Sequence, residues 1–112
     1  MSNSKWLTQV KKGLLELCLL NLLAREQMHG YELVKRLTAI PGLMVTVGTI
    51  YPLLNRLKRE GLLSSLIEES PSGPPRRRYN LTSEGRNRVL EINKTWNEIN
   101  RHVADLMISP ED

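Results

Sequence analysis

The segment of residues 69–75 constrains the fold of this chain more than any other part of the sequence. It reads ESPSGPP and holds three prolines, a glycine and two serines. Such a composition excludes a helix and a central strand. Extended segments of about residues 63–68 and 77–81 flank it, which predicts a β-hairpin. Elsewhere the apolar residues recur at helical spacing, so the predicted fold is mainly α with one small β-hairpin.

Four helices are expected around this hairpin. Their predicted ranges are about residues 7–25, 30–39, 47–60 and 83–107. Thr46 and Thr82 are the expected N-caps of the last two helices, and Gly61 is the expected stop of the third. Residues 27–30 are expected to form a short connection. The second helix is expected to bury Tyr31 with Leu33, Val34 and Leu37.

The second and third helices predict a helix-turn-helix that binds DNA, with the third helix in the major groove. Asn55 and Arg56 are candidates for base edges, since an amide pairs with adenine and a guanidinium with guanine. The remaining candidates on these two helices are Lys35, Arg36, Thr49, Tyr51, Pro52 and Arg59, of which the charged ones suit phosphates. A solvated basic face on an ordinary helical protein is the alternative interpretation.

Arg76, Arg77 and Arg78 follow the proline-rich segment directly. Arginines on a wing can enter a minor groove, where the negative potential of DNA is focused. Charged residues on a hairpin also prevent pairing between sheet edges, and this is the alternative role. Together with the upstream helices, the run favours DNA contact, which predicts a winged helix-turn-helix over residues 1–82.

The last helix carries an apolar seam with alternating spacings of three and four, as in a coiled coil. The seam comprises Val89, Ile92, Trp96, Ile99, Val103 and Leu106. The first helix is apolar on two faces, one of which includes Leu15 and Leu19, and a helix of this kind must be covered on two sides. Residues 83–112 are therefore predicted to form a dimerisation helix with a short tail, and the chain is predicted to be a homodimer.

Trp96 has two possible roles on this seam. It packs between subunits in the commoner case. If the helices splay apart, Trp96 and its mate bound a pocket that stacks on a planar aromatic molecule, with Trp6, Asn93 and Asn100 as further candidates.

Several function classes find no support in the sequence. His29 and His102 are isolated, and no cluster has metal-ligand spacing, so no metal, cofactor or catalytic site is expected. Cys18 is the single cysteine and lies in an apolar run too short for a membrane span. No signal peptide is evident, which predicts a cytoplasmic protein. The net charge of +4 suits an anionic partner.

The chain resembles the PadR family of bacterial transcriptional regulators. The resemblance rests on LLELCLL at residues 14–20, MHGYEL at 28–33, VGTIYPLLNRL at 47–57, EGLL at 60–63, RRRY at 76–79 and LTSEG at 81–85. The single helix after the wing is similar to the compact subgroup of that family. Val47 departs from the pattern, because many members have proline there.

The resemblance implies a dimer that forms through the last helix and the first. It implies a repressor of genes for multidrug exporters or stress responses. In a multidrug-sensing member, the tryptophan that matches Trp96 stacks on flat aromatic drugs at the dimer centre. The resulting hypothesis is a repressor on a palindromic operator of double-stranded DNA, relieved by a small aromatic ligand or a stress signal. A multidrug-binding protein and an adaptor that binds an acidic protein partner remain alternatives.

Overall fold

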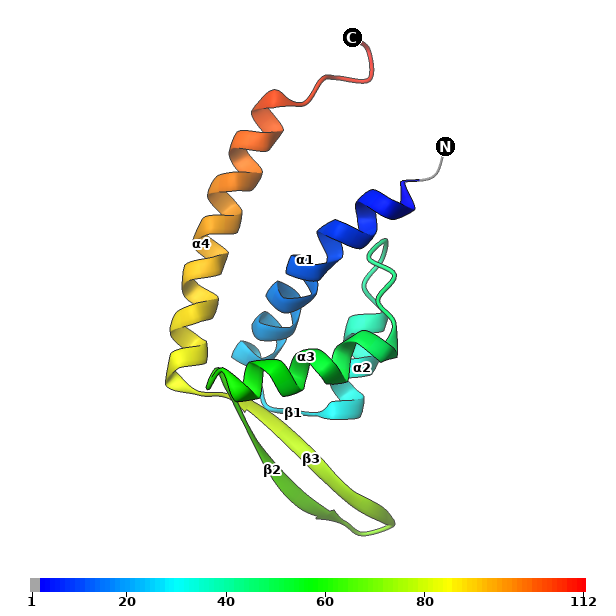
Figure 1. The fold of residues 1–112 in the computed structure, drawn as a ribbon, viewed down its shortest axis with the longest axis vertical. Helices are drawn as coiled ribbons and strands as arrows, with labels where there is room; N and C mark the ends of the chain where they lie inside the picture. Colours follow the sequence, from blue (N-terminus) through cyan, green and yellow to red (C-terminus); the bar gives the residue numbers. More distant parts are fainter. Residues whose placement is uncertain (1–2) are drawn as a thin grey trace.

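The computed structural model describes residues 3–112 (Figure 1). Its elements are α1 (Ser4–Arg25), β1 (Met28–His29), α2 (Gly30–Thr38), α3 (Val47–Arg59), β2 (Leu63–Ser70), β3 (Gly73–Leu81) and α4 (Ser83–Leu106). The four predicted helices and the hairpin are confirmed. The ends of the helices differ from the predicted ends by at most three residues, the largest difference being at the start of α1, which begins at Ser4 and not at residue 7.

The core lies where α1, α2 and α3 meet. Its most completely buried side chains are Leu19, Leu20, Leu33, Leu37, Ile50, Leu54 and Leu57. Each buried leucine or isoleucine contributes about 1.5–3 kcal/mol relative to an exposed one. The apolar stripe of α3 is therefore held against α1 and α2, and the opposite side of α3 faces outward.

The sheet has three antiparallel strands in the order β1-β3-β2. Met28 pairs with Tyr79, and Leu63 pairs with Leu81. The expected connection at residues 27–30 is thus wrong in part, since Met28 and His29 form β1. A strand of two residues leaves no periodic pattern in the sequence. Met28 and His29 form a strand because they pair with β3 along the edge of β3 that is not paired with β2.

The wing is longer than predicted. β2 runs to Ser70 and β3 begins at Gly73, so the excluded segment of residues 69–75 is strand at both ends. The register of the pairing shifts between Glu68 and Ser70, so the ladder is irregular near the tip of the hairpin. Pro74 and Pro75 are tolerated because β1 pairs with β3 only at Tyr79 and Arg78, which leaves the other edge of β3 open beside the prolines.

The start of α4 is tightly anchored on the winged helix. The hydroxyl of Thr82 accepts a hydrogen bond of 3.0 Å from the backbone N–H of Gly85, which confirms the predicted cap. A Cβ at Gly85 would lie 2.0 Å from the carbonyl oxygen of Leu62, so only glycine allows this approach. Thr46 also occupies an N-cap position, but its side chain makes no capping bond.

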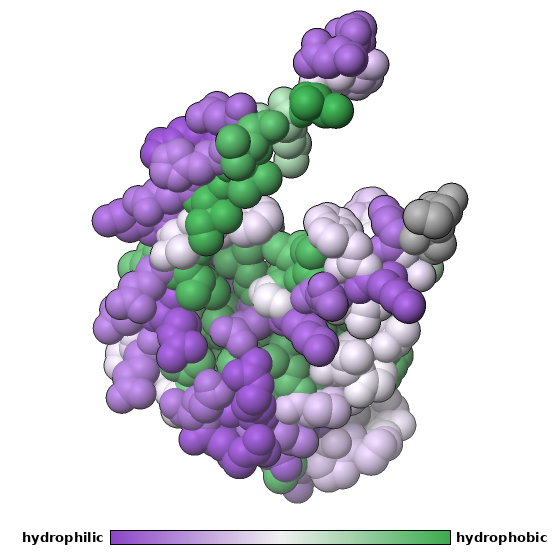
Figure 2. Space-filling view, turned by 45° about the horizontal axis from the view of Figure 1, so that its top comes forward, coloured by the Kyte–Doolittle hydropathy of each residue, from purple (hydrophilic) through white to green (hydrophobic). Residues whose placement is uncertain are grey.

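Beyond its first turns α4 diverges from α1 and extends away from the body (Figure 1). Val89 is buried, whereas Ile99, Val103 and Leu106 are 51%, 42% and 83% exposed. Figure 2 shows hydrophobic side chains along the side of α4 that faces the hollow toward α1. We call Ile99, Val103 and Leu106 the distal strip.

Candidate nucleic-acid interface and ligand cavity

A groove separates the outer side of α3 from the wing. It is lined by His29, Gly30, Tyr31, Tyr51, Asn55, Pro75, Arg76, Arg77 and Tyr79. The fold thereby brings together Tyr51 and Asn55 of α3 with Arg76 and Arg77 of β3, which the sequence predicted separately. We call it the wing groove.

Gly30 allows Tyr51 to lie in the wing groove. A Cβ on Gly30 would be 3.2 Å from both Cε1 and Oη of the Tyr51 ring, closer than a comfortable contact. The missing side chain thus lets Tyr51 pack over the start of α2 while 42% of its surface stays exposed. The glycine of the MHGYEL segment positions an aromatic residue of α3.

Tyr31 is not buried as predicted, because 52% of its surface is exposed. The apolar side of α2 is formed by Leu33 and Leu37, and Tyr31 lies off that side. The Arg76 guanidinium is 5.8 Å from the centroid of the Tyr31 ring, and Lys35 Nζ is 6.0 Å from it. Tyr31 therefore holds two of the predicted DNA-binding cations through cation–π contacts. The contact between Tyr31 and Lys35 could have been inferred from the sequence, because residues four positions apart lie on the same face of a helix.

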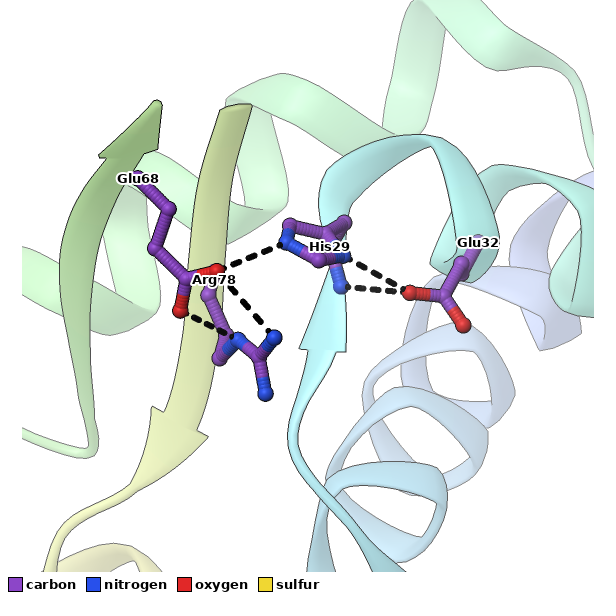
Figure 3. A network of polar contacts seen from close by, with 4 residues as sticks. All are labelled: His29, Glu32, Glu68 and Arg78. Atoms are coloured by element: carbon purple, nitrogen blue, oxygen red, sulfur yellow. Dashed lines mark hydrogen bonds and ion pairs between the residues drawn. The ribbon is translucent and has the colours of Figure 1, made fainter. Parts of the chain in front are cut away.

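A polar network ties the wing to α2 (Figure 3). Arg78 Nε lies 2.6 Å from Glu68 Oε1, and His29 Nε2 lies 3.4 Å from Glu68 Oε2. On its other side, His29 Nδ1 lies 3.0 Å from Glu32 Oε1. The hydrogen bonds from His29 lower the pKa of Glu32. Arg78 thus holds the hairpin in place through Glu68, and a DNA contact by Arg78 stays a prediction.

Arg56 is engaged inside the chain. Its Nη2 donates to Glu16 Oε1 of α1 at 2.6 Å, and its Nη1 donates to Glu60 Oε2 at 2.8 Å. These hydrogen bonds, chiefly the one with Glu16, raise the pKa of Arg56. The base contact predicted for Arg56 stays a prediction, and it would require Arg56 to leave both carboxylates. Asn55 lies in the wing groove, and among residues 3–112 no side-chain hydrogen bond or ion pair engages it.

The other predicted DNA-binding residues lie outside the wing groove. Thr49, Pro52 and Arg59 line a second groove between α3 and α1, together with Lys11 and Lys12. Arg36 lies at the junction of α2 with α1, beside Cys18 and Asn21. These predicted residues therefore line a different groove or hollow from Asn55 and Arg76.

A cavity of about 490 Å³ lies between α1 and α4. It is lined by Gly13, Glu16, Leu17, Arg88, Glu91, Ile92, Thr95, Trp96 and Ile99. We call it the α1–α4 cavity. Trp96 lines this cavity within one protomer and is 40% exposed. The pocket expected between Trp96 and its mate in a second subunit stays a prediction.

The other three predicted ligand contacts are not among the residues that line this cavity. Asn93 exchanges two hydrogen bonds with Asn21, of 2.8 and 2.9 Å, so its amide is committed within the chain. Trp6 is 62% exposed near the start of α1. Asn100 is exposed on α4.

Three of the predicted interface residues belong to the protomer's own core. Leu15, Leu19 and Val89 are 7%, 0% and 2% exposed, so their side chains present little or no surface to a partner. The reason is that α1 packs against α4 and the sheet within the chain. Ile92 is half-buried, and the distal strip is exposed.

The described residues were also compared with the requirements of a metal site and of a membrane span. Among residues 3–112, no group of three or more His, Cys, Asp or Glu side chains is placed to hold a metal ion. No helix in the same range is long and apolar enough to cross a membrane. Burial raises the pKa of the half-buried Cys18 thiol.

Comparison with known proteins decides the family. The model of the transcriptional regulator PadR-like family matches residues 19–91, which run from α1 through the wing into α4. The chain belongs to the PadR-like family. It is a DNA-binding transcriptional regulator with a winged helix, and its single helix after the wing is consistent with the compact subgroup.

Individual relatives agree over nearly the whole chain. The transcriptional regulator Rv3488 of Mycobacterium tuberculosis is 33% identical over 95 residues, which are 85% of this chain and 87% of that protein. A PadR-like regulator from Bacillus cereus has a TM-score of 0.80 and 34% identity, and the match covers 90% of this chain and 98% of that one. A PadR-like factor from Bacteroides fragilis has a TM-score of 0.75 and 39% identity, with 95% and 100% covered.

Proposed function

We propose that this PadR regulator is a homodimeric repressor that binds a palindromic operator in the cytoplasm and has no catalytic activity. Residues 1–82 bind the DNA and residues 83–112 dimerise. The wing groove carries the proposal, because Tyr51 and Asn55 of α3 lie beside Arg76 and Arg77 of the wing. With α3 in the major groove, the wing arginines meet the adjacent phosphates or minor groove.

The distal strip supports the homodimer. Contiguous exposed apolar residues on a soluble protein mark an interaction surface. In the proposed dimer a second α4 covers Ile99, Val103 and Leu106. Two winged helices about 34–36 Å apart then bind half-sites one helical turn apart.

The DNA proposal is tested on duplexes selected in vitro by the full chain. Asn55→Ala is expected to lose about 1–3 kcal/mol of discrimination at one base pair of each half-site. Lys35→Ala is expected to weaken binding to all duplexes alike and to reduce the salt slope. Lys94→Ala on α4 removes the same charge away from the groove and serves as the control. An Asn55→Ala protein with unchanged sequence preference would contradict the assignment of α3.

We further propose that a small aromatic ligand, in a multidrug-sensing role, relieves operator binding from the α1–α4 cavity. Trp96 supports this role, because it lines the cavity with apolar Leu17, Ile92 and Ile99. A ligand shifts an equilibrium only if it binds one dimer geometry better than another. Quenching of Trp96 fluorescence by aromatic compounds tests the site. Absence of quenching by any compound would remove this role and leave DNA binding intact.

A further inference from the structure

The groove between α1 and α3 lies on another side of α3 than the wing groove, and no residue lines both. Its volume is about 460 Å³. Sites of about 300–1,000 Å³ hold small ligands, so the space is large enough for one. We call it the α1–α3 groove, and the residues that define it are Thr8, Lys12 and Leu15 of α1 with Thr49, Leu53 and Arg59 of α3.

Two contacts hold the walls of the α1–α3 groove together. Lys11 Nζ of α1 donates a hydrogen bond of 2.9 Å to the carbonyl oxygen of Met44, in the segment that precedes α3. One turn farther along α1, Glu16 Oε1 accepts the bond of 2.6 Å from Arg56 Nη2 of α3. The groove is therefore formed within the chain, and a ligand does not have to open it.

The wall of the groove carries positive charge without a countercharge. Among the described residues that line it, four are cations and none is acidic. Arg56 is paired with Glu16 and Glu60, which lie outside the lining. In the described part of the chain no ion pair engages Lys12 or Arg59. A cleft lined by one sign of charge concentrates the opposite sign, so the groove favours an anion.

The rest of the wall is largely aliphatic. Leu15, Val45 and Leu53 of the core line the groove, and Pro52 adds further apolar surface. No aromatic side chain of residues 3–112 lines it, so a flat aromatic molecule finds no ring on which to stack. A saturated chain gains from apolar burial alone. An anion with an aliphatic tail is thus complementary to both parts of the wall.

We propose that the α1–α3 groove binds the anion of a free fatty acid, with its chain against Leu15 and Leu53 and its carboxylate attracted by Lys12 and Arg59. The site is separate from the α1–α4 cavity and does not depend on the aromatic ligand proposed above. Arg59 is also a predicted phosphate contact, so the carboxylate and DNA compete for one charge. This competition rests on the proposed docking of α3 on DNA. By linkage, each ligand weakens the binding of the other by the same factor.

Three probes test the chemistry of the site by equilibrium dialysis against the full chain. Dodecanoate has both features, dodecyltrimethylammonium has the same chain with the opposite charge, and butyrate has the carboxylate on a short chain. We expect dodecanoate to bind at least about tenfold more tightly than either of the others. Equal binding of dodecanoate and the ammonium ion would overturn the charge selection. Equal binding of dodecanoate and butyrate would overturn the role of the aliphatic wall.

Two pairs of variants locate the bound anion. Thr8→Phe places a ring in the groove and is expected to weaken dodecanoate binding at least about tenfold, whereas Gln9→Phe adds the ring beside the groove and should bind like the parent. Lys12→Gln removes a cation of the wall and is expected to weaken binding about threefold. Lys5→Gln removes the same charge from α1 outside the groove and is the control. Unchanged binding in both Thr8→Phe and Lys12→Gln would place the anion elsewhere.

Operator binding separates this proposal from the function described above. Saturating dodecanoate is expected to weaken binding of the parent to the selected duplex about tenfold, and Thr8→Phe should abolish this effect. Bound dodecanoate with unchanged DNA affinity would overturn the competition and support the anion site. If dodecanoate does not bind and Lys12→Gln weakens binding to all duplexes alike, the groove is a phosphate contact and the proposal falls, while operator binding stands. Binding to phosphatidylglycerol vesicles without binding of dodecanoate would also overturn the free anion as the occupant.

Discussion

The wing and the distal half of α4 are held in opposite ways. The hairpin projects from the body, but Glu68, Arg78 and His29 tie it to α2 (Figure 3). The distal strip of α4 also lies away from the body, and it is exposed within the protomer. A hairpin that must present arginines at a fixed position needs partners within its own chain. An apolar helix face without such partners is suited to a second chain, and this contrast underlies the proposed dimer.

The largest expected effect comes from breaking the distal strip. Val103→Glu places a charge among apolar residues that the proposed dimer buries, so we expect a monomer in analytical ultracentrifugation. Loss of bivalent binding should lower operator affinity by about 100-fold. Asn97→Glu adds the same charge to the exposed side of α4 off the seam and should leave the dimer intact. A dimeric Val103→Glu protein would place the interface elsewhere.

The junction between the two regions is the next most sensitive point. Gly85→Ala forces a Cβ to within 2.0 Å of the Leu62 carbonyl oxygen, so backbone must shift where α4 meets the sheet. We expect the free energy of unfolding to fall by about 2 kcal/mol in a denaturant titration. Gly13→Ala has no atom within 4 Å of the new Cβ and should raise it by about 0.5–1 kcal/mol. Equal effects of the two substitutions would show that the backbone of Leu62 can move away from a side chain at position 85 at little cost in free energy.

A smaller effect is expected at the cation–π contacts of the wing groove. Tyr31→Leu removes the ring that faces Arg76 and Lys35 and should weaken operator binding about threefold, from a contact worth about 0.5–1 kcal/mol at an exposed site. Tyr31→Phe keeps a ring and should bind like the parent. If the phenylalanine protein is as weak as the leucine protein, the Tyr31 hydroxyl is the group that matters.

The smallest effect concerns acid sensitivity of the network in Figure 3. The pKa of Glu32 is lowered in the folded chain by its hydrogen bonds from His29, so its ionised form favours folding. This contribution is complete above the ordinary glutamate pKa of 4.5 and is lost as the pH falls through the lower folded-state value. The stability difference between the parent and Glu32→Gln should therefore shrink below about pH 4.5. A difference that is the same at pH 6 and pH 3 would contradict this assignment.

The sequence predicts the helices well because each carries an apolar stripe at helical spacing. It misses β1, since two residues show no period, and it shortens the wing, since prolines beside an unpaired edge still fit a strand. Tyr31 was assigned to the core because it is aromatic and near the apolar positions of α2. Its exposure follows from the angle around the helix, which depends on where Leu33 and Leu37 find the core.

The sequence predicts which residues are chemically suited to bind DNA or a ligand. It does not predict which side chains of the same chain these residues contact. Asn55 and Arg56 are neighbours on one helix and both suit base edges, yet Arg56 contacts Glu16, which is 40 positions away in the chain. Asn93 is likewise committed to Asn21 across two helices. Such pairs arise from tertiary packing, which a single sequence does not record. The same limit explains why Leu15, Leu19 and Val89 were assigned to an interface.

The central claim is that two chains, joined through α4, place two wing grooves on one duplex. Sedimentation of the full chain with the selected operator duplex at about 0.2 M salt measures this stoichiometry directly, since specific complexes persist at such salt. We expect two chains per duplex and a dimer in the absence of DNA. One chain per duplex, or no complex with any selected duplex, would contradict the account.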